Sequence, residues 1–93
     1  MAETREIKMN YAEGSKEERF AALMEKYVGK TTYIQHLDDE GGNKITSHRE
    51  YITNEYGGTN SMSMSNGVIT FKKRDARGGV KEAIVKPIDE FEA

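Results

Sequence analysis

A chain of 93 residues with 35% apolar and 32% charged residues predicts one small domain, spanning 1–93, with a single hydrophobic core. Its formal net charge of −2 excludes a global attraction to nucleic acid or to an anionic membrane. The sequence has no cysteine for a disulfide framework, and no apolar run reaches the ~20 residues of a membrane-spanning helix. We therefore expect a cytoplasmic protein with no membrane partner.

The first predicted element is a strand over 5–11, which follows four residues that we expect to be disordered. Ile7, Met9 and Tyr11 alternate with polar residues, and this period of two is typical of a half-buried strand. The alternative is a frayed N-terminal arm. A strand here would lie near a sheet edge, where pairing between two copies is easy, and this is the reason to consider a homodimer.

An amphipathic helix is predicted between Ser15 and Gly29. Ser15 and Glu18 match a capping box, and Gly29 suits a left-handed C-terminal cap. A one-sided helix of roughly 14 residues is not stable alone in water, so a sheet must cover its apolar stripe. The stripe follows helical spacing and consists of Phe20, Leu23, Met24, Tyr27 and Val28.

Two strands are predicted next, over 31–37 and 44–53, with an acidic turn at 38–43 between them. The pattern leaves their register open. If His36 lay opposite His48, the two imidazoles and a nearby carboxylate would have the residue types of a metal site. Two histidines near an acidic turn are more typical of an exposed strand pair, so we predict no metal and no cofactor.

A hairpin is predicted around Asn66-Gly67, the preferred pair for a type I′ turn. Pairing outward from this turn sets Met64 opposite Ile69, so that the methionines share a face with apolar partners. The remaining pairs of this register are Ser65 with Val68, Ser63 with Thr70, and Met62 with Phe71.

A second hairpin is predicted to turn over 75–79, with Arg74 opposite Val80. Continuing that register sets Lys72 opposite Glu82 on the outer face. The inner face would then cover the helix and consist of Met62, Met64, Ile69, Phe71, Ala83 and Val85. Pro87 ends the last strand because it lacks a backbone N–H.

The order of these elements predicts an α+β fold in which one N-terminal helix packs on an antiparallel sheet of five to six strands. It resembles the cystatin-like arrangement, although only in element order. Cystatin-type inhibitors carry a glutamine-x-valine-x-glycine hairpin, whereas Gln35, the one glutamine here, is followed by His36-Leu37. Protease inhibition is therefore not implied. The alternative fold is a small SH3-like or Sm-like barrel with an N-terminal helix.

Catalytic motifs are weak in this sequence. Gly29-Lys30-Thr31-Thr32 lacks the first glycine of a phosphate-binding loop and follows a helix, whereas that loop precedes one. Three serines, Ser61, Ser63 and Ser65, alternate along an outer strand face with no strained elbow around them. We therefore expect a protein without enzymatic activity.

The candidate partner-binding surface is the basic hairpin. Six bases and two acids between Lys72 and Lys86 give this segment +4 and leave −6 for the rest of the chain. The bases either bind a partner or protect a sheet edge. A protein partner is favoured over nucleic acid because no aromatic residue interleaves the bases. The predicted binding residues are Lys72, Lys73, Arg74, Arg77 and Lys81, with the outward apolar residues Val68 and Ile84.

These observations predict a non-catalytic interaction module, a regulator or inhibitor that binds a larger protein, of a small acidic kind common in phages and mobile elements. The alternative is a nucleic-acid-binding module that uses the basic hairpin over 72–81.

Overall fold

The computed structural model describes residues 3–93. In chain order its elements are β1 (Glu3–Ile7), α1 (Lys16–Tyr27), β2 (Gly29–Leu37), β3 (Asn43–Tyr51), β4 (Gly57–Ser65), β5 (Val68–Asp75), β6 (Val80–Pro87) and α2 (Ile88–Glu92).

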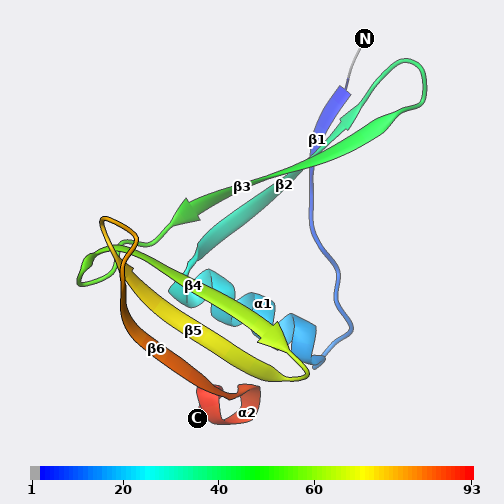
Figure 1. Ribbon diagram of the computed structural model, residues 1–93. Coiled ribbons are helices and arrows are strands. Elements are labelled where there is room, and N and C mark those ends of the chain that lie inside the picture. The colour runs from blue at the N-terminus through cyan, green and yellow to red at the C-terminus, as the bar shows by residue number, and fades with distance from the viewer. Residues whose placement is uncertain (1–2) are drawn as a thin grey trace.

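The strands form two separate three-stranded antiparallel sheets, with the orders β1-β2-β3 and β4-β5-β6. We call the first sheet the arm, and α1 with the second sheet and α2 the body. In Figure 1 the β2–β3 hairpin projects from the body, and β1 lies along its far half. The predicted fold class, one N-terminal helix on a five- to six-stranded sheet, is wrong. The cystatin-like layout and the barrel alternative are wrong with it.

The two sheets separate because the chain turns locally between β3 and β4. The side chain of Asn54 accepts hydrogen bonds from the backbone N–H groups of Tyr56 (2.9 Å) and Gly58 (3.2 Å). A side chain that bonds to nearby backbone in this way competes with a β ladder. Between 51 and 57 the remaining pairing is one isolated bridge, Thr53 with Thr59.

Helix α1 begins as predicted. Ser15 accepts the backbone N–H of Glu18 at 3.1 Å, and the Glu18 carboxylate accepts the backbone N–H of Gly14 at 3.1 Å. The capping box thus reaches one residue further back than predicted, because the N–H of Ser15 bonds to Ala12 O. The helix ends at Tyr27 and β2 starts at Gly29, so only Val28 lies between them.

The predicted N-terminal strand is displaced towards the start of the chain. Strand β1 ends at Ile7, so Met9 and Tyr11 lie in the segment 8–15 that links the arm to α1. Glu3 and Thr4, expected to be disordered, belong to β1. Residues 1 and 2 of that expected disordered segment lie outside the described residues.

The hydrophobic core lies entirely in the body. Its buried members are Leu23, Val28, Met62, Ile69, Phe71 and Ile88. Helix α2 closes one end of it, because Phe91 makes edge-on ring contacts with Tyr27 and Phe71, each with centroids 5.6 Å apart. Arg19 on α1 reinforces this contact through ion pairs with Asp89 and Glu92.

The register predicted around Asn66-Gly67 is confirmed in all four pairs. The register of the next hairpin is wrong beyond its first pair. Arg74 does lie opposite Val80, but a bulge follows and sets Lys73 opposite Glu82, leaving Lys81 without a cross-strand partner. Phe71 therefore pairs with Ile84 and Ile69 with Lys86, so Ala83 and Val85, which were predicted on the inner face, lie on the outer face. Lys72 pairs with Ala83, where Glu82 was predicted.

Within residues 3–93, neither helix is long and apolar enough to cross a membrane.

Candidate partner-binding cavity

The five predicted basic residues do not form one surface. Because neighbouring residues of a strand point to opposite faces, Lys73 lies on the α1 side of the sheet with Phe71, whereas Lys72 and Arg74 lie on the outer side. Arg77 is exposed in the turn between β5 and β6. The basic hairpin therefore presents its charges in several directions.

Two of these bases are also paired with carboxylates of the same chain. The ammonium of Lys73 lies 3.0 Å from Glu55 and 3.7 Å from Glu82. Its hydrogen bond to Glu55 raises the pKa of Lys73 and lowers the pKa of Glu55. Lys81 lies 3.8 Å from Asp75. These pairs reduce the positive potential that a phosphate backbone would meet.

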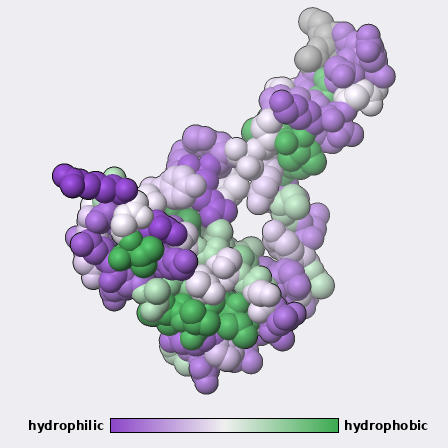
Figure 2. All heavy atoms as spheres, viewed as in Figure 1, coloured by the Kyte–Doolittle hydropathy of each residue, from purple (hydrophilic) through white to green (hydrophobic). Residues whose placement is uncertain are grey.

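The predicted apolar binding residues lie on different faces. Val68 is 37% exposed on the outer face, as predicted, whereas Ile84 pairs with Phe71 and so belongs to the α1 side. The register shift puts Val85 outward in its place, 65% exposed. Figure 2 shows a group of hydrophobic atoms over β5 and β6. Single exposed valines of this kind are common on protein surfaces.

A concave feature formed by the described residues lies between the arm and the body. It is a cavity of about 730 Å³, lined by α1, the link 8–15 and the first residues of β2. Figure 2 shows this hollow between the projecting hairpin and the body. We call it the arm cavity. Its apolar lining consists of Ile7, Met9, Tyr11, Phe20, Ala21, Met24, Tyr33 and Met64.

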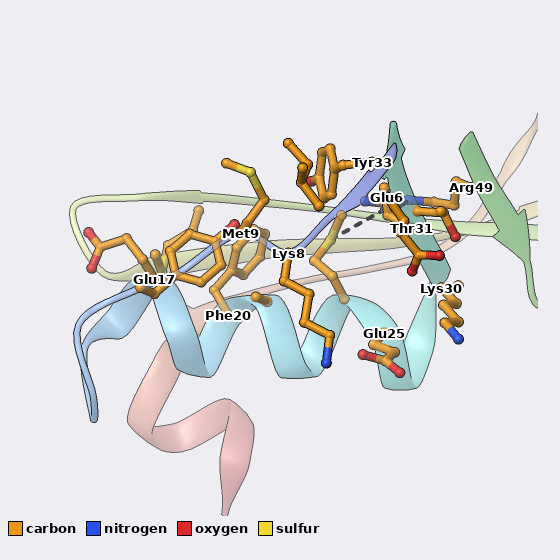
Figure 3. A pocket seen from close by; sticks show the side chains of 17 residues that line it. Glu6, Lys8, Met9, Glu17, Phe20, Glu25, Lys30, Thr31, Tyr33 and Arg49 are labelled. Atoms are coloured by element: carbon orange, nitrogen blue, oxygen red, sulfur yellow. Dashed lines mark hydrogen bonds between the residues drawn. The ribbon is translucent and has the colours of Figure 1, made fainter. Parts of the chain in front are cut away.

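The arm cavity exists because the second sheet covers only part of the apolar stripe of α1. Leu23 is buried against the second sheet, whereas Phe20 and Met24 are only half-buried and also line the cavity. On the side of the arm, the cavity is lined by Tyr33 and Ile7, which are cross-strand partners. Figure 3 shows Phe20 beside Met9 at one end of the cavity and Tyr33 above α1.

Charged side chains surround the apolar lining, and Arg49 is the most constrained of them. Its Nε donates to Thr31 Oγ1 at 2.7 Å, and its guanidinium lies 4.0 Å from the sulfur of Met24. Within residues 3–93 no carboxylate is close enough to form an ion pair with Arg49. Figure 3 places it at the opposite end of the cavity from Phe20. The other charged lining residues are Glu6, Lys8, Glu17, Glu25 and Lys30.

The register of the arm separates the two histidines. His36 lies opposite Lys44 and bonds to Thr46 Oγ1 at 2.9 Å, whereas His48 lies opposite Thr32. The pairing of His36 with His48 is therefore wrong. Within the described part of the chain, no group of three metal-ligating side chains is present.

The N-terminal edge expected to mediate a homodimer is short. Strand β1 has five residues, so the edge strand that was predicted over 5–11 ends at Ile7. The other three edge strands are longer: β3 and β4 have nine residues each and β6 has eight.

In comparisons with known proteins, no family model, no curated protein and no solved structure matches this chain. Function must therefore be inferred from the geometry.

Reasoning from the sequence missed the arm cavity. It assigned Phe20 and Met24 to the core because their spacing marks a buried stripe, and spacing does not show how wide the covering sheet is. The alternation of Ile7, Met9 and Tyr11 was a usable signal, since all three residues do line one apolar surface.

Proposed function

We propose that this chain is a non-catalytic interaction module that binds an apolar segment of a larger protein in the arm cavity. The observation that supports it most is the incomplete cover of α1, which leaves Phe20 and Met24 facing a hollow of ligand-binding size. In this role the chain is a regulator or inhibitor that acts by occupying a surface of its partner.

The charges at the cavity favour a protein segment that carries an acidic residue. Among the described residues Arg49 has no carboxylate partner, and it is held by Thr31, so its guanidinium is oriented before binding. A carboxylate beside apolar side chains would satisfy it, because guanidinium and carboxylate groups form paired hydrogen bonds. The apolar part of such a segment would lie over Phe20 and Met9.

Binding to this cavity is testable with the apolar anionic dye anilinonaphthalene sulfonate. We expect its fluorescence to rise with the wild-type protein and to fall strongly with Met9→Glu, which adds a charge at an exposed lining residue, 49% exposed. Val85→Glu is the matched control, since it changes an exposed apolar residue outside the cavity. Equal loss in both variants would contradict the proposal.

A pull-down from the organism that encodes the chain tests the natural partner. A protein retained by the wild type and by Val85→Glu, and lost with Met9→Glu, supports the proposal. The alternative function predicts nucleic acid in the retained fraction, with an affinity that falls with salt at a log–log slope of roughly −3 to −4 for four phosphate contacts. Retained nucleic acid that is insensitive to Met9→Glu would replace the proposed function.

A further inference from the structure

Strand β3 leaves a long regular edge open on the arm. It is the outer strand of its sheet and pairs with β2 through nine consecutive residues without a bulge. No proline interrupts it, and seven of its nine residues are exposed. Natural edge strands are usually protected by short length, proline, bulges or charged side chains, because free backbone groups bind another strand. Strand β3 lacks the first three and has only its charged residues, Lys44, Arg49 and Glu50, two of which a matching strand can pair.

The other edges of the described sheets carry such protection. Strand β1 has only five residues. The register of β4 with β5 is irregular between Gly57 and Asn60, and the start of β4 is covered by the bridge to Thr53. Strand β6 has the bulge at Lys81 and ends in Pro87. The edge of β3 is therefore the best site for strand addition.

We propose that a second copy of this chain occupies that edge, with the two β3 strands antiparallel and the two-fold axis at Ser47. This register sets Lys44 of each copy opposite Glu50 of the other, so the interface holds two opposite-charge cross-strand pairs. Within residues 3–93, neither Lys44 nor Glu50 forms an ion pair with its own chain. Moving the axis to Thr46 or His48 removes both pairs.

The antiparallel arrangement also keeps the two bodies apart. The body joins β3 beyond Tyr51, so in the dimer the bodies lie at opposite ends of one six-stranded sheet. The acidic turn of each copy, 38–40, then extends past the other copy's Tyr51 towards its segment 52–56. That segment lies beside β5, since Glu55 is 3.0 Å from Lys73. Figure 1 shows the end of β3 near the turn between β5 and β6.

The acidic turn carries Asp38, Asp39 and Glu40, whereas the turn between β5 and β6 carries Asp75 as well as Arg77. The charge complementarity of the dimer therefore lies in the two pairs of Lys44 with Glu50. The dimer edge shares Arg49 with the lining of the arm cavity, but the evidence for the dimer, the open edge of β3 and the pairing of Lys44 with Glu50, does not depend on the proposed function.

Charge reversal tests the interface by sedimentation equilibrium. Lys44→Glu and Glu50→Lys each replace two attractive pairs with two repulsive ones, so we expect the dimer Kd to rise about tenfold or more in each variant. The double variant, with both changes, restores the pairs and should return to within roughly threefold of the wild type. A monomeric wild type, or a dimer that neither single variant weakens, would overturn the proposal.

Cysteine cross-linking tests the register, and the chain has no cysteine of its own to interfere. In the proposed dimer the two Ser47 residues face each other with Cα atoms ~5 Å apart, within disulfide range. Ser47→Cys should form a disulfide-linked dimer on mild oxidation. Ile45→Cys, on the same strand, places the two sulfurs about 13 Å apart and should not. Faster linking of Ile45→Cys would overturn the proposed axis.

Discussion

Asn60 joins the end of α1 to the second sheet through its side-chain amide. It is 8% exposed, donates to Tyr27 O at 2.9 Å and accepts from Asn54 Nδ2 at 2.8 Å. Asn54 in turn donates to Arg74 O at 2.9 Å. Two asparagines thus connect α1, β5 and the turn that separates the two sheets.

We expect Asn60→Ala to lower the free energy of unfolding by about 2 kcal/mol, because it leaves the part-buried Tyr27 carbonyl without its donor and removes the buried Asn60 amide that accepts from Asn54. Urea denaturation followed by circular dichroism measures the change. Ser63→Ala, on an exposed residue of the same strand, should change the free energy of unfolding by less than about 0.5 kcal/mol. Equal effects of the two variants would show that the Asn60 network does not stabilise the fold.

Asp75 makes the turn between β5 and β6 sensitive to pH. Backbone N–H groups of Gly79 and Arg77, each 2.9 Å from its carboxylate, hold the pKa of Asp75 below its ordinary value of 3.8. Since the folded state binds this proton less readily than the unfolded state, the stabilisation is complete above pH 3.8. It is lost as the pH falls through the lower folded-state pKa.

The matched variant is Asp75→Asn, which keeps an acceptor oxygen and removes the charge. Urea denaturation between pH 6 and pH 2 should find the wild type more stable than Asp75→Asn at pH 6, with the difference shrinking below pH 3.8. A difference that stayed constant over this range, or grew at low pH, would contradict the assigned role of the carboxylate.

The elements that could be predicted were those specified by residues close together in the sequence. Ser15 and Glu18 set the start of α1, and Asn66-Gly67 set a hairpin register that the structure confirms. The bulge at Lys81 was not predictable from alternation, because one extra residue leaves the pattern of apolar and polar side chains plausible in either register. Because of this one extra residue, Ile84 lies on the α1 side of the sheet and Val85 on the outer side, the reverse of the prediction.

The junction between α1 and β2 depends on Gly29. Its φ is +151°, and a Cβ on this residue would lie 2.1 Å from Glu50 O, which a side chain cannot do without displacing β3. Gly29→Ala should therefore lower the free energy of unfolding by roughly 3 kcal/mol in a urea titration.

Gly14→Ala is the control for the strain of backbone conformation alone. Gly14 has φ +73° with no atom within 4 Å of an added Cβ, so we expect a loss of only about 1 kcal/mol. If Gly29→Ala cost no more than Gly14→Ala, the close packing of β2 on β3 at this junction would be refuted.

At the scale of the whole molecule, the division into two sheets was hidden from sequence reasoning. Strand signals over 31–37 and 44–53 identify strands correctly, but strand periodicity does not indicate which sheet a strand joins. The arm cavity followed from the same long-range pairing, since it lies between segments far apart in the chain. Pairings of this kind depend on contacts that no local pattern encodes.

The shape of the monomer is the most direct consequence of this division. A compact domain of this length has a radius of gyration of about 12 Å, whereas the chain measures 16.1 Å with extents of 47 × 33 × 17 Å. Within residues 3–93 the arm contributes no buried side chain to the core, so no apolar burial of this kind holds the arm against the body. Small-angle X-ray scattering on Lys44→Glu, at concentrations where it is monomeric, should give a radius close to 16.1 Å. A value near 12 Å would mean that the arm folds onto the body and closes the arm cavity.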